Sequence, residues 1–495
     1  MFVNYTEPNS MRFEKWITNP ESKKQHNIMC LVGNGFDTAI FNKYVSGIPN
    51  KKSSYSDFYD YITFHGLLNM ANDAENTGKL IDEKTRNIIY NKMKGDKNTY
   101  EKRLKNYEKH KKEAEEKHIE LTNREPELNW CDFEKSIDEL IFDDTVRTQY
   151  INQYNDELVS TLKQSNKKVS DENIELAYYK RINNDLIVMR DNFSRFINDL
   201  LSSDIIINLN KDARNYKWAY QSLQNFLEDL KNSDNIKNME FPHKCQNAHL
   251  MNFGFFCFNY TTLLDNYICL DQGQFDPHTY KDADTNFIFN ADPNGMFSVD
   301  HENNDNSNKK DRFLSVYLLA DIIHPHGIKD VPRSMLFGTE NPKYNVKEYN
   351  KNFVKSYWGQ NNRKYLKDFQ ETELFIIYGM SLGSSDGWWM GNVYKRLLGH
   401  NSKDSETDNK AELIIYFFSK DELDNAAEIE YQNKIKENFC NACVFYDEDK
   451  IKYSKSKRVK KYNELVKSRI YVVILHDNNN SFLGFNKTTT PTYNY

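Results

Sequence analysis

Short, nearly continuous apolar runs alternate with longer amphipathic stretches along this chain of 495 residues. Runs of this length that are apolar on both faces are typical of strands in a parallel sheet covered by helices. Between several of them lie stretches with helical spacing, such as WWMGNVYKRLL and DELDNAAEIEYQNKIKENF. The pattern predicts an α/β fold, a Rossmann-like, doubly wound and mainly parallel sheet. The runs cover residues 27–32, 253–260, 319–327, 334–338, 373–383, 412–419 and 470–477.

A large helical insertion interrupts this pattern. Residues 96–253 contain no glycine and only two prolines, and they are rich in Lys, Glu, Asn, Leu and Ile at helix-like spacing. Residues 53–62 (SSYSDFYDYI) also read as helical. The expected organisation is a first part of a Rossmann-like nucleotide-binding domain at 1–66, a helical insertion at 67–250, and the remainder of the domain at 251–478 with a long loop or lid at 271–312. A polar C-terminal tail at 479–495 is expected to be loose, although its aromatic side chains could dock on the domain.

Composition narrows the class of protein. With Tyr 32 and Phe 31 the chain has enough aromatic area to pack a core. The net charge is -6 and charges of both signs are interspersed, so we expect neither a membrane surface nor general nucleic-acid binding. No signal-peptide core opens the sequence, and the cysteine count is odd at 7, which favours reduced thiols and a cytoplasmic protein. The single CxxC, Cys440 to Cys443, lacks a second ligand pair, and we expect no metal.

The first candidate loop is GNGFD at residues 33–37, directly after the first apolar run and at the start of a helix. Gly33 and Gly35 would let the backbone, with Asn34 between them, turn sharply and approach a pyrophosphate at the helix N-terminus. The dinucleotide fingerprint is incomplete, because Thr38 stands at the third glycine position. A plain tight turn explains the two glycines equally well.

Two further loops follow the second and third predicted strands. Asn259, in FNYTTLLD, would present an amide that both donates and accepts hydrogen bonds, although an Asn or Thr that caps the next helix is an equal interpretation. His324 and His326 lie in HPHG, where a histidine beside a glycine can act as a base near neutral pH. Strand-end histidines that only support the fold are the alternative, and the sequence does not distinguish which ring faces a pocket.

The fourth loop is GMSLGSSDG at residues 379–387, between an apolar run and a helix. Its glycines, Ser381 and Asp386 could bind ribose hydroxyls and phosphates. The first five residues also match G-x-S-x-G, the nucleophile elbow of serine hydrolases. Four strand-end loops with small or polar residues, in a chain that is poor in glycine, together predict a nucleotide pocket at one edge of the sheet.

These motifs carry a family resemblance. In order along the chain, LVGNGFD, SSYSDF, NWCDFEKSI, FNYTTLLDNY, HPHG and FIIYGMSLGSSD resemble the bacterial phage abortive-infection family AbiH. The resemblance covers residues 27–66 and roughly 250–420, and the insertion resembles the family mainly through Trp130, Asp132 and Glu134. AbiH in turn resembles the sirtuin-like, NAD-consuming domains of antiphage systems.

The second resemblance implies roles for individual residues. It implies that Gly33, Gly35 and Asp37 hold phosphate and ribose, that Asn259 orients water or the ribose, and that His326 is the base. It also implies that Ser381 and Asp386 bind the adenosine half of NAD, the substrate. This sequence departs from the sirtuin-like pattern twice, with Asp37 in place of a serine and Thr261 in place of an aspartate.

The implied function is an antiphage effector that hydrolyses NAD or a related nucleotide at the N-glycosidic bond and thereby arrests the infected cell. Two alternatives stay open at this point. The protein could be a nucleotide-binding sensor without turnover, or another hydrolase such as a nuclease, phosphoesterase or serine hydrolase. The expected partners are the nucleotide, a phage-derived trigger protein and further copies of the same chain in a homo-oligomer.

Overall fold

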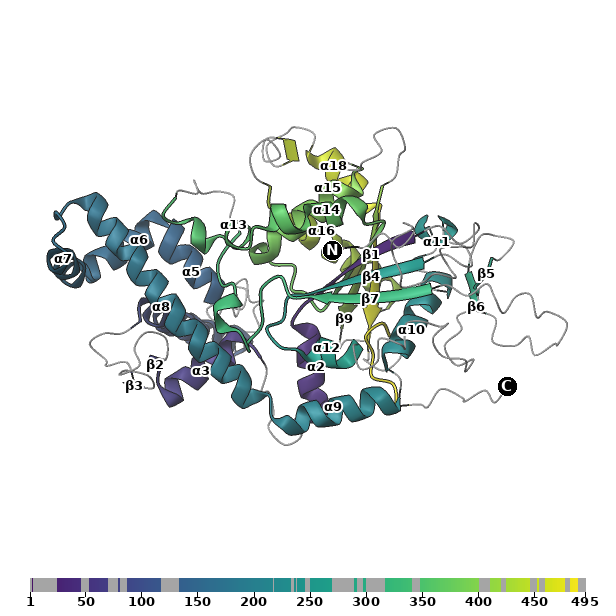
Figure 1. Ribbon diagram of the computed structural model, residues 1–495, viewed down its shortest axis with the longest axis horizontal. Helices are drawn as coiled ribbons and strands as arrows, with labels where there is room; N and C mark the ends of the chain where they lie inside the picture. The colour runs from purple at the N-terminus through teal and green to yellow at the C-terminus, as the bar shows by residue number, and fades with distance from the viewer. Residues whose placement is uncertain are drawn as a thin grey trace, which may run out of the picture. The chain divides into compact units, whose positions relative to one another are not determined.

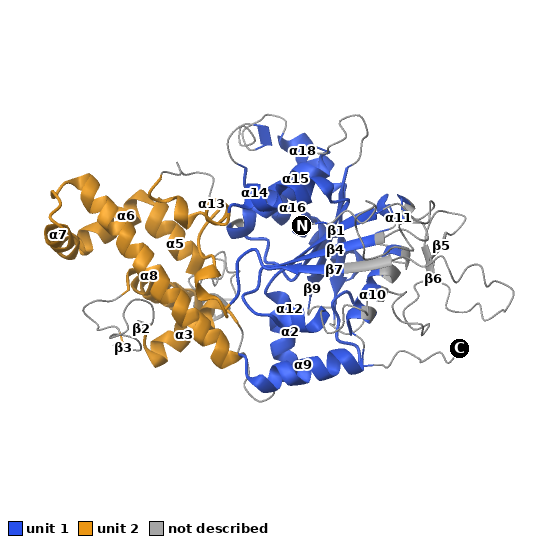
Figure 2. Ribbon diagram, in the orientation of Figure 1, with its two compact units in different colours: residues 1–50, 201–328, 360–495 blue, residues 51–200, 329–359 orange. Residues whose placement is uncertain are grey.

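The chain forms two compact units, which Figure 2 shows in different colours. We call residues 1–50, 201–328 and 360–495 the sheet unit, and residues 51–200 and 329–359 the helical unit. The structure is a computed structural model. It describes residues 2, 25–45, 53–69, 79–80, 87–116, 133–216, 218–232, 236, 238–244, 250–268, 289–291, 297–299, 317–340, 348–399, 410–419, 424–445, 452–453, 459–476 and 481–487.

The sheet unit contains a 6-stranded parallel sheet in the order β10-β9-β8-β1-β4-β7. The first three strands along the chain, β1, β4 and β7, run outward from β1 in one direction, and the last three run outward from β8 in the other. This is the strand order of the Rossmann fold, with its reversal between β1 and β8. The doubly wound α/β prediction is confirmed. The strands are β1 (Gln25–Val32), β4 (Leu250–Cys257), β7 (Tyr317–Ile323), β8 (Leu374–Tyr378), β9 (Glu412–Phe418) and β10 (Ile470–Leu475).

Helices cover both faces of this sheet (Figure 1). One face is covered by α14 (Asn361–Glu371), α15 (Gly387–Leu397), α16 (Asn425–Ala442) and α18 (Val459–Lys467). The other is covered by α2 (Gly35–Tyr44), α10 (Trp218–Asn232) and α12 (Leu263–Ile268), and α9 (Ser203–Asn215) contacts α2 and α12. A four-residue helix, α11 (Phe241–Lys244), precedes β4.

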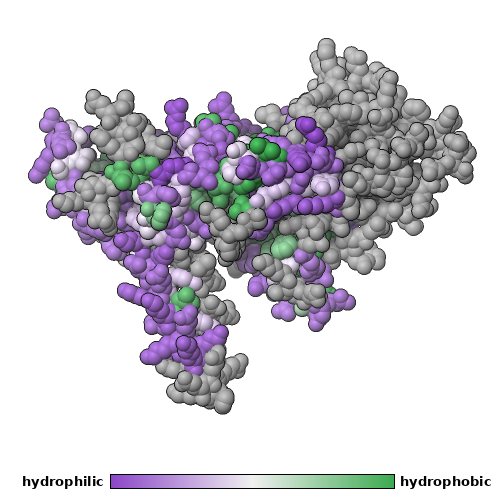
Figure 3. Space-filling view, turned by 90° about the horizontal axis from the view of Figure 1, so that it is seen from below, coloured by the Kyte–Doolittle hydropathy of each residue, from purple (hydrophilic) through white to green (hydrophobic). Residues whose placement is uncertain are grey.

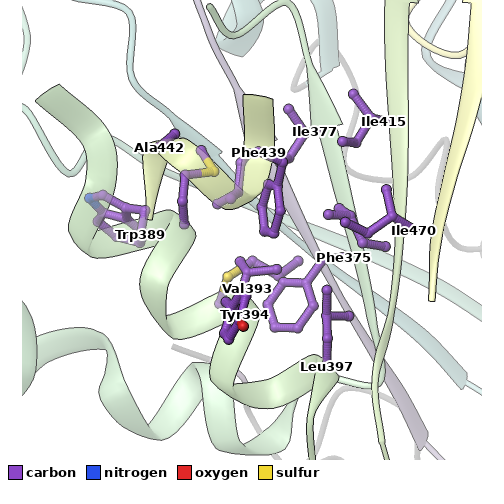
Figure 4. Close-up of a cluster of buried hydrophobic side chains, with 14 of the residues drawn as sticks. Phe375, Ile377, Trp389, Val393, Tyr394, Leu397, Ile415, Phe439, Ala442 and Ile470 are labelled. Atoms are coloured by element: carbon purple, nitrogen blue, oxygen red, sulfur yellow. The ribbon is translucent and has the colours of Figure 1, made fainter. Parts of the chain in front are cut away.

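Alternation along the strands divides the core between the two faces. Figure 4 shows the first core, in which Phe375, Ile377 and Ile415 of the strands pack against Trp389 and Phe439 of α15 and α16. Their neighbours along the strands point to the opposite face, because successive side chains of a strand alternate. Buried on both faces, β8 shows the continuous apolar pattern that predicted a parallel strand.

The C-terminal segment Ser481–Lys487 is not loose, contrary to the expectation for the tail. Phe482 stacks on Phe255 of β4, with ring centroids 6.3 Å apart, and Phe485 packs against Phe36 of α2 at 6.0 Å. The hydroxyl of Tyr267 donates to the carbonyl of Gly484 over 2.6 Å. The aromatic side chains of Ser481–Lys487 fill gaps on the α2 face of the sheet, and their burial holds the segment in place although the tail is polar on average.

The helical unit is built around aromatic side chains. Phe58, Phe133, Phe193 and Phe337 are buried and contact one another, for example Phe133 and Phe337 with centroids 5.1 Å apart. Its elements are α3 (Tyr55–His65), β2 (Leu68–Asn69), β3 (Lys79–Leu80), α4 (Ile88–Glu116), α5 (Phe133–Phe142), α6 (Asp144–Gln153), α7 (Asn155–Gln164), α8 (Asp171–Leu200), η8 (Pro332–Ser334), η9 (Lys351–Phe353) and α13 (Lys355–Trp358).

The units place the boundaries at other residues than the pattern suggested. The helical unit begins at residue 51 and includes residues 329–359, whereas α9, α10 and α11 belong to the sheet unit. Residues 334–338, expected as a strand, form a 3-10 turn and an irregular segment. Their apolar side chains are buried by helices of the helical unit instead of by strand pairing, as the contacts of Phe337 show.

Other expectations lie partly outside the described residues. Of the predicted loop at 271–312, the structure describes β5 (Phe289–Ala291) and β6 (Phe297–Val299), which pair antiparallel. Trp130 and Asp132 are not among the described residues. No helix in the described part of the chain combines the length and apolar character needed to cross a membrane. On the face drawn in Figure 3, hydrophilic residues cover most of the described surface.

Candidate functional site

The four candidate loops meet at the carboxyl edge of the sheet. Val32, the last residue of β1, pairs with Cys257 of β4 and with Tyr378 of β8, and Phe256 pairs with Ile323 of β7. The loops that follow these strands therefore start at the same level. They also flank the point at which the strand order reverses, where Rossmann-type sheets bind their ligands.

Close packing of two loops accounts for the glycines of the first motif. A Cβ atom on Gly35 would lie 2.6 Å from the Cα of Gly379, and one on Gly33 would lie 2.7 Å from the Gly379 carbonyl oxygen. The amide of Gly33 donates to the carbonyl of Tyr378 over 2.9 Å, and the amide of Gly35 donates to that of Gly379 over 2.8 Å. The bare backbone lets the β8 loop approach, and these two amides are already hydrogen-bonded. A ligand-binding role for Gly33, Asn34 and Gly35 stays a prediction. A ligand at this loop would have to bind to groups other than these two amides.

Asp37 is the centre of a buried polar network. Its side chain is in the first turn of α2 and the residue is 1% exposed. Oδ1 accepts a hydrogen bond from Nδ2 of Asn259, and Oδ2 accepts one from Oγ1 of Thr261, both 2.7 Å long. Burial raises the pKa of Asp37 from 3.8 to about 7, although the two hydrogen bonds and the charge of His324 oppose this rise.

The network joins the two departures from the sirtuin-like pattern. Asp37 and Thr261 stand at the two unexpected positions, and they are the two ends of one hydrogen bond. The carboxylate of Asp37 faces Asn259 and Thr261, and is buried among them. A carboxylate in this loop is therefore compensated within the protein by two hydrogen bonds.

The same network fixes the orientation of Asn259. Its Nδ2 is committed to Asp37, and the residue is 4% exposed. Since the amide is held by its donor group, the carbonyl oxygen Oδ1 points away from Asp37. Oδ1 accepts no hydrogen bond from the part of the chain that the structure describes. Asn259 therefore presents a fixed acceptor.

The two histidines of HPHG have different surroundings. The Nε2 atom of His324 lies 2.9 Å from Oδ2 of Asp265, and its Nδ1 atom lies 3.3 Å from the main-chain oxygen of Asn259. Burial alone lowers the pKa of His324, but the hydrogen bond and charge of Asp265 outweigh it, and the net effect is a raised pKa. From the sequence, Thr261 stands out only as a departure from the sirtuin-like pattern, and Asp265 has no predicted role although it follows the same strand.

His326 lies beside the β8 loop. It is 4% exposed, and its ring packs edge-on against Phe258 with centroids 4.9 Å apart. Nε2 of His326 is 3.8 Å from Oδ1 of Asp386. The structure thus brings Asp386, expected on the adenosine half of a ligand, next to the predicted base. The ligand roles of both residues stay predictions.

Ser381 does not have the geometry of a serine nucleophile. It is exposed, and its hydroxyl makes no hydrogen bond to a histidine within the described residues. The left-handed backbone conformations of this loop are at Gly379 (φ 65) and Leu382 (φ 52), not at the serine. The strained elbow that aims a catalytic serine is absent at Ser381, and the motif match is explained by a loop that packs on the first glycines. Its predicted role toward adenosine is untested.

A Rossmann-type sheet with a buried Asp–Asn–Thr network and two histidines at its switch point defines an α/β protein with a candidate ligand site at the carboxyl edge. Residues 29–405, more than half of the chain, match the family described as bacteriophage abortive infection AbiH. The chain belongs to this family, which implies a role in phage abortive infection. No curated protein and no solved structure matches the chain significantly.

Proposed function

We propose that this AbiH-family protein arrests infected cells by hydrolysing NAD, or a related nucleotide, at the N-glycosidic bond. The observation that carries the proposal is the fixed Asn259 amide. Asp37 holds its Nδ2, so that Oδ1 is left to accept from a ribose hydroxyl or a water. His326 belongs to the neighbouring loop of the same sheet edge. An oriented acceptor beside a histidine is what the reaction requires of the protein.

The reaction breaks the bond between C1′ of the ribose and the pyridinium nitrogen. The bonding electrons go to that nitrogen, and nicotinamide leaves as a neutral molecule, so no general acid is needed. Water adds to C1′ and its proton passes to a base, for which we propose His326. The transition state is a ribosyl cation, which Asn259 orients and nearby carboxylates stabilise.

The charges of the site suit the reacting half of NAD. Asp37 and Asp386 supply carboxylates at the site, whereas that of Asp265 is paired with His324. A cationic pyridinium and a cationic transition state are both favoured by this arrangement. The diphosphate needs donors other than the amides of Gly33 and Gly35, since these are engaged in the contact between loops. NAD is proposed as a substrate, and no metal enters the proposal.

The test is to quantify NAD and nicotinamide by mass spectrometry in cells that express the protein, with and without phage. Asn259→Ala and His326→Ala are compared with Asn152→Ala and His110→Ala, which alter exposed residues of the helical unit. We expect NAD loss with the wild type and the two control variants, and none with the two site variants. Unchanged NAD during effective defence by the wild type would refute the proposal.

The proposal extends to the setting of the reaction. A cytoplasmic enzyme that depletes a shared nucleotide must be inactive before infection, so we propose a phage-derived trigger protein and a homo-oligomeric assembly. Native mass spectrometry of the purified protein tests the assembly. Co-purification from infected cells, followed by NAD turnover with the recovered phage protein, tests the trigger.

A nucleotide sensor without turnover is the second candidate. Asp37 and Thr261, which hydrogen-bond each other, favour it, because they replace two residues of the NAD-consuming pattern. The sensor model predicts that a nucleotide raises the melting temperature of the pure protein and is recovered intact. Release of nicotinamide would exclude it.

A further inference from the structure

The ring of His324 lies between two groups that can only accept hydrogen bonds. Nε2 faces the carboxylate of Asp265 at 2.9 Å, and Nδ1 faces the main-chain carbonyl oxygen of Asn259 at 3.3 Å. The side chain is 14% exposed, so bulk water has little access to either nitrogen. These contacts connect α12, β7 and the end of β4 through one imidazole.

A neutral imidazole satisfies only one of these contacts. In either neutral tautomer one nitrogen carries a proton and the other carries a lone pair, which would face the oxygen of an acceptor. The imidazolium has a proton on each nitrogen and donates to both neighbours. The two carboxylates near the ring, Asp265 and Asp37, favour the same cationic form.

We propose that His324 is a doubly protonated imidazolium at neutral pH that pairs with Asp265, donates to the Asn259 main chain and positions Asn259, while His326 remains the base. The positioning part rests on the function proposed above, whereas the protonation part does not. His324 acts on the reaction through Asn259 and is therefore a positioning residue. A ring with both nitrogens protonated has no lone pair with which to accept a proton from water.

The groups that face His324 set the direction of its pH dependence. They are Asp265 on α12, the carbonyl of Asn259 after β4, and Asp37 on α2. Because the pKa of His324 is raised above that of an unfolded chain, the stability that the ion pair contributes is fully present below about pH 6.5. It is lost as the pH rises through the higher pKa of the folded state.

The protonation state can be read without any assay of activity. We would label the full-length protein with 15N-histidine, record two-bond 1H–15N spectra from pH 6 to 9, and assign His324 by the loss of its signals in His324→Gln. At pH 7 we expect two protonated nitrogens on His324, and a midpoint about 1 to 3 pH units lower in Asp265→Asn. Asp204→Asn, an exposed aspartate of the sheet unit, should change nothing. A neutral ring at pH 7 in the wild type would overturn the proposal.

Kinetics separate positioning from support of the fold. With NAD as substrate, His324→Gln should lower kcat about 10-fold or more and leave KM nearly unchanged. The reason is that a displaced Asn259 stabilises the transition state less but binds the ground state of the substrate about as well. Wild-type kcat should fall above the midpoint measured by NMR, and the variant should lack that limb. If KM rises and kcat is unchanged, the positioning role is wrong. If the ring is an imidazolium but NAD is not cleaved, the proposed function fails and the protonation inference stands.

Discussion

Replacement of Asp37 by asparagine should change how the stability of the sheet unit depends on pH. Asp37 is fully buried and accepts hydrogen bonds from Asn259 and Thr261. Asparagine has nearly the same shape but does not ionise. The substitution therefore removes one titration from the folded state with little change in packing.

The magnitude follows from the shift in pKa. Burial raises the pKa of Asp37 from 3.8 to about 7, which corresponds to about 4 kcal/mol at 1.36 kcal/mol per pH unit. The sign is set by linkage. A carboxyl group whose pKa is higher in the folded state stabilises that state fully below pH 3.8, and this contribution is lost as the pH rises to about 7. The free energy of unfolding of the wild type should fall over this window, and that of the variant should fall by about 4 kcal/mol less.

The assay is urea unfolding of both proteins between pH 4.5 and pH 8, followed by tryptophan fluorescence, since Trp218, Trp388 and Trp389 are buried in the sheet unit. The difference in free energy of unfolding between variant and wild type should increase with pH and level off above pH 7. Thr261→Val removes a hydrogen bond that lowers the pKa of Asp37, so it should move this midpoint to higher pH. A difference that is independent of pH would refute the reasoning.

Three further predictions concern the packing of two core positions and one buried ion pair. Gly35→Ala places a Cβ 2.6 Å from the Cα of Gly379, and the overpacking should cost about 1–3 kcal/mol in urea unfolding and reduce any ligand affinity measured in parallel. Phe485→Ala should cost about 3–5 kcal/mol in the same assay, since this ring is a core residue; a smaller loss than 1 kcal/mol would show that the segment is dispensable. Lys355→Met removes one partner of Glu134, 3.0 Å away in the helical unit, and should cost about 3–5 kcal/mol, whereas adding Glu134→Gln should restore part of the loss.

The sheet was predictable because its pattern is local. β1, β8 and most of β9 are buried on both faces, and a short apolar run between helical stretches carries that information in the sequence itself. The same rule was wrong for residues 334–338, which are equally apolar. There the burial comes from helices, and an apolar run alone does not reveal what covers it.

The C-terminal segment shows that polar composition does not exclude a buried segment, just as an apolar run does not establish a strand. Residues 479–495 carry Phe482, Leu483 and Phe485 among mainly polar residues, and the average composition of this tail resembles that of a loose terminus. Phe482 and Phe485 are buried because the α2 face of the sheet has spaces of matching size, which are formed by residues distant in sequence. The composition of the segment therefore could not predict its packing, because the surface that buries the two rings forms only when the rest of the sheet unit folds.

The candidate site was predictable as a location but not as a set of contacts. The rule that ligands bind beyond the carboxyl ends of parallel strands selected the loops that contain Asn259, the two histidines of HPHG and Asp386, and the resemblance to sirtuin-like domains singled out Asp37 and His326. Pairing of side chains across loops requires the register of the strands and the rotation of each loop, which a single sequence does not contain. For this reason the pairing of His324 with Asp265 was not predicted.

The contacts of Asp37 also bear on the choice of ligand. A buried carboxyl group with a pKa of about 7 is only partly ionised at neutral pH, so its charge responds to what binds nearby. A cationic ligand would favour the ionised form of Asp37 and an anionic ligand the neutral form. By linkage, binding of a cationic ligand releases a proton from Asp37, and binding of an anionic ligand leads Asp37 to take one up. The pyridinium ring of NAD is a cation at the end of the molecule that reacts. If that end binds beside Asp37, the protein gains negative charge as the ligand enters, and the same charge then stabilises the ribosyl cation as nicotinamide leaves.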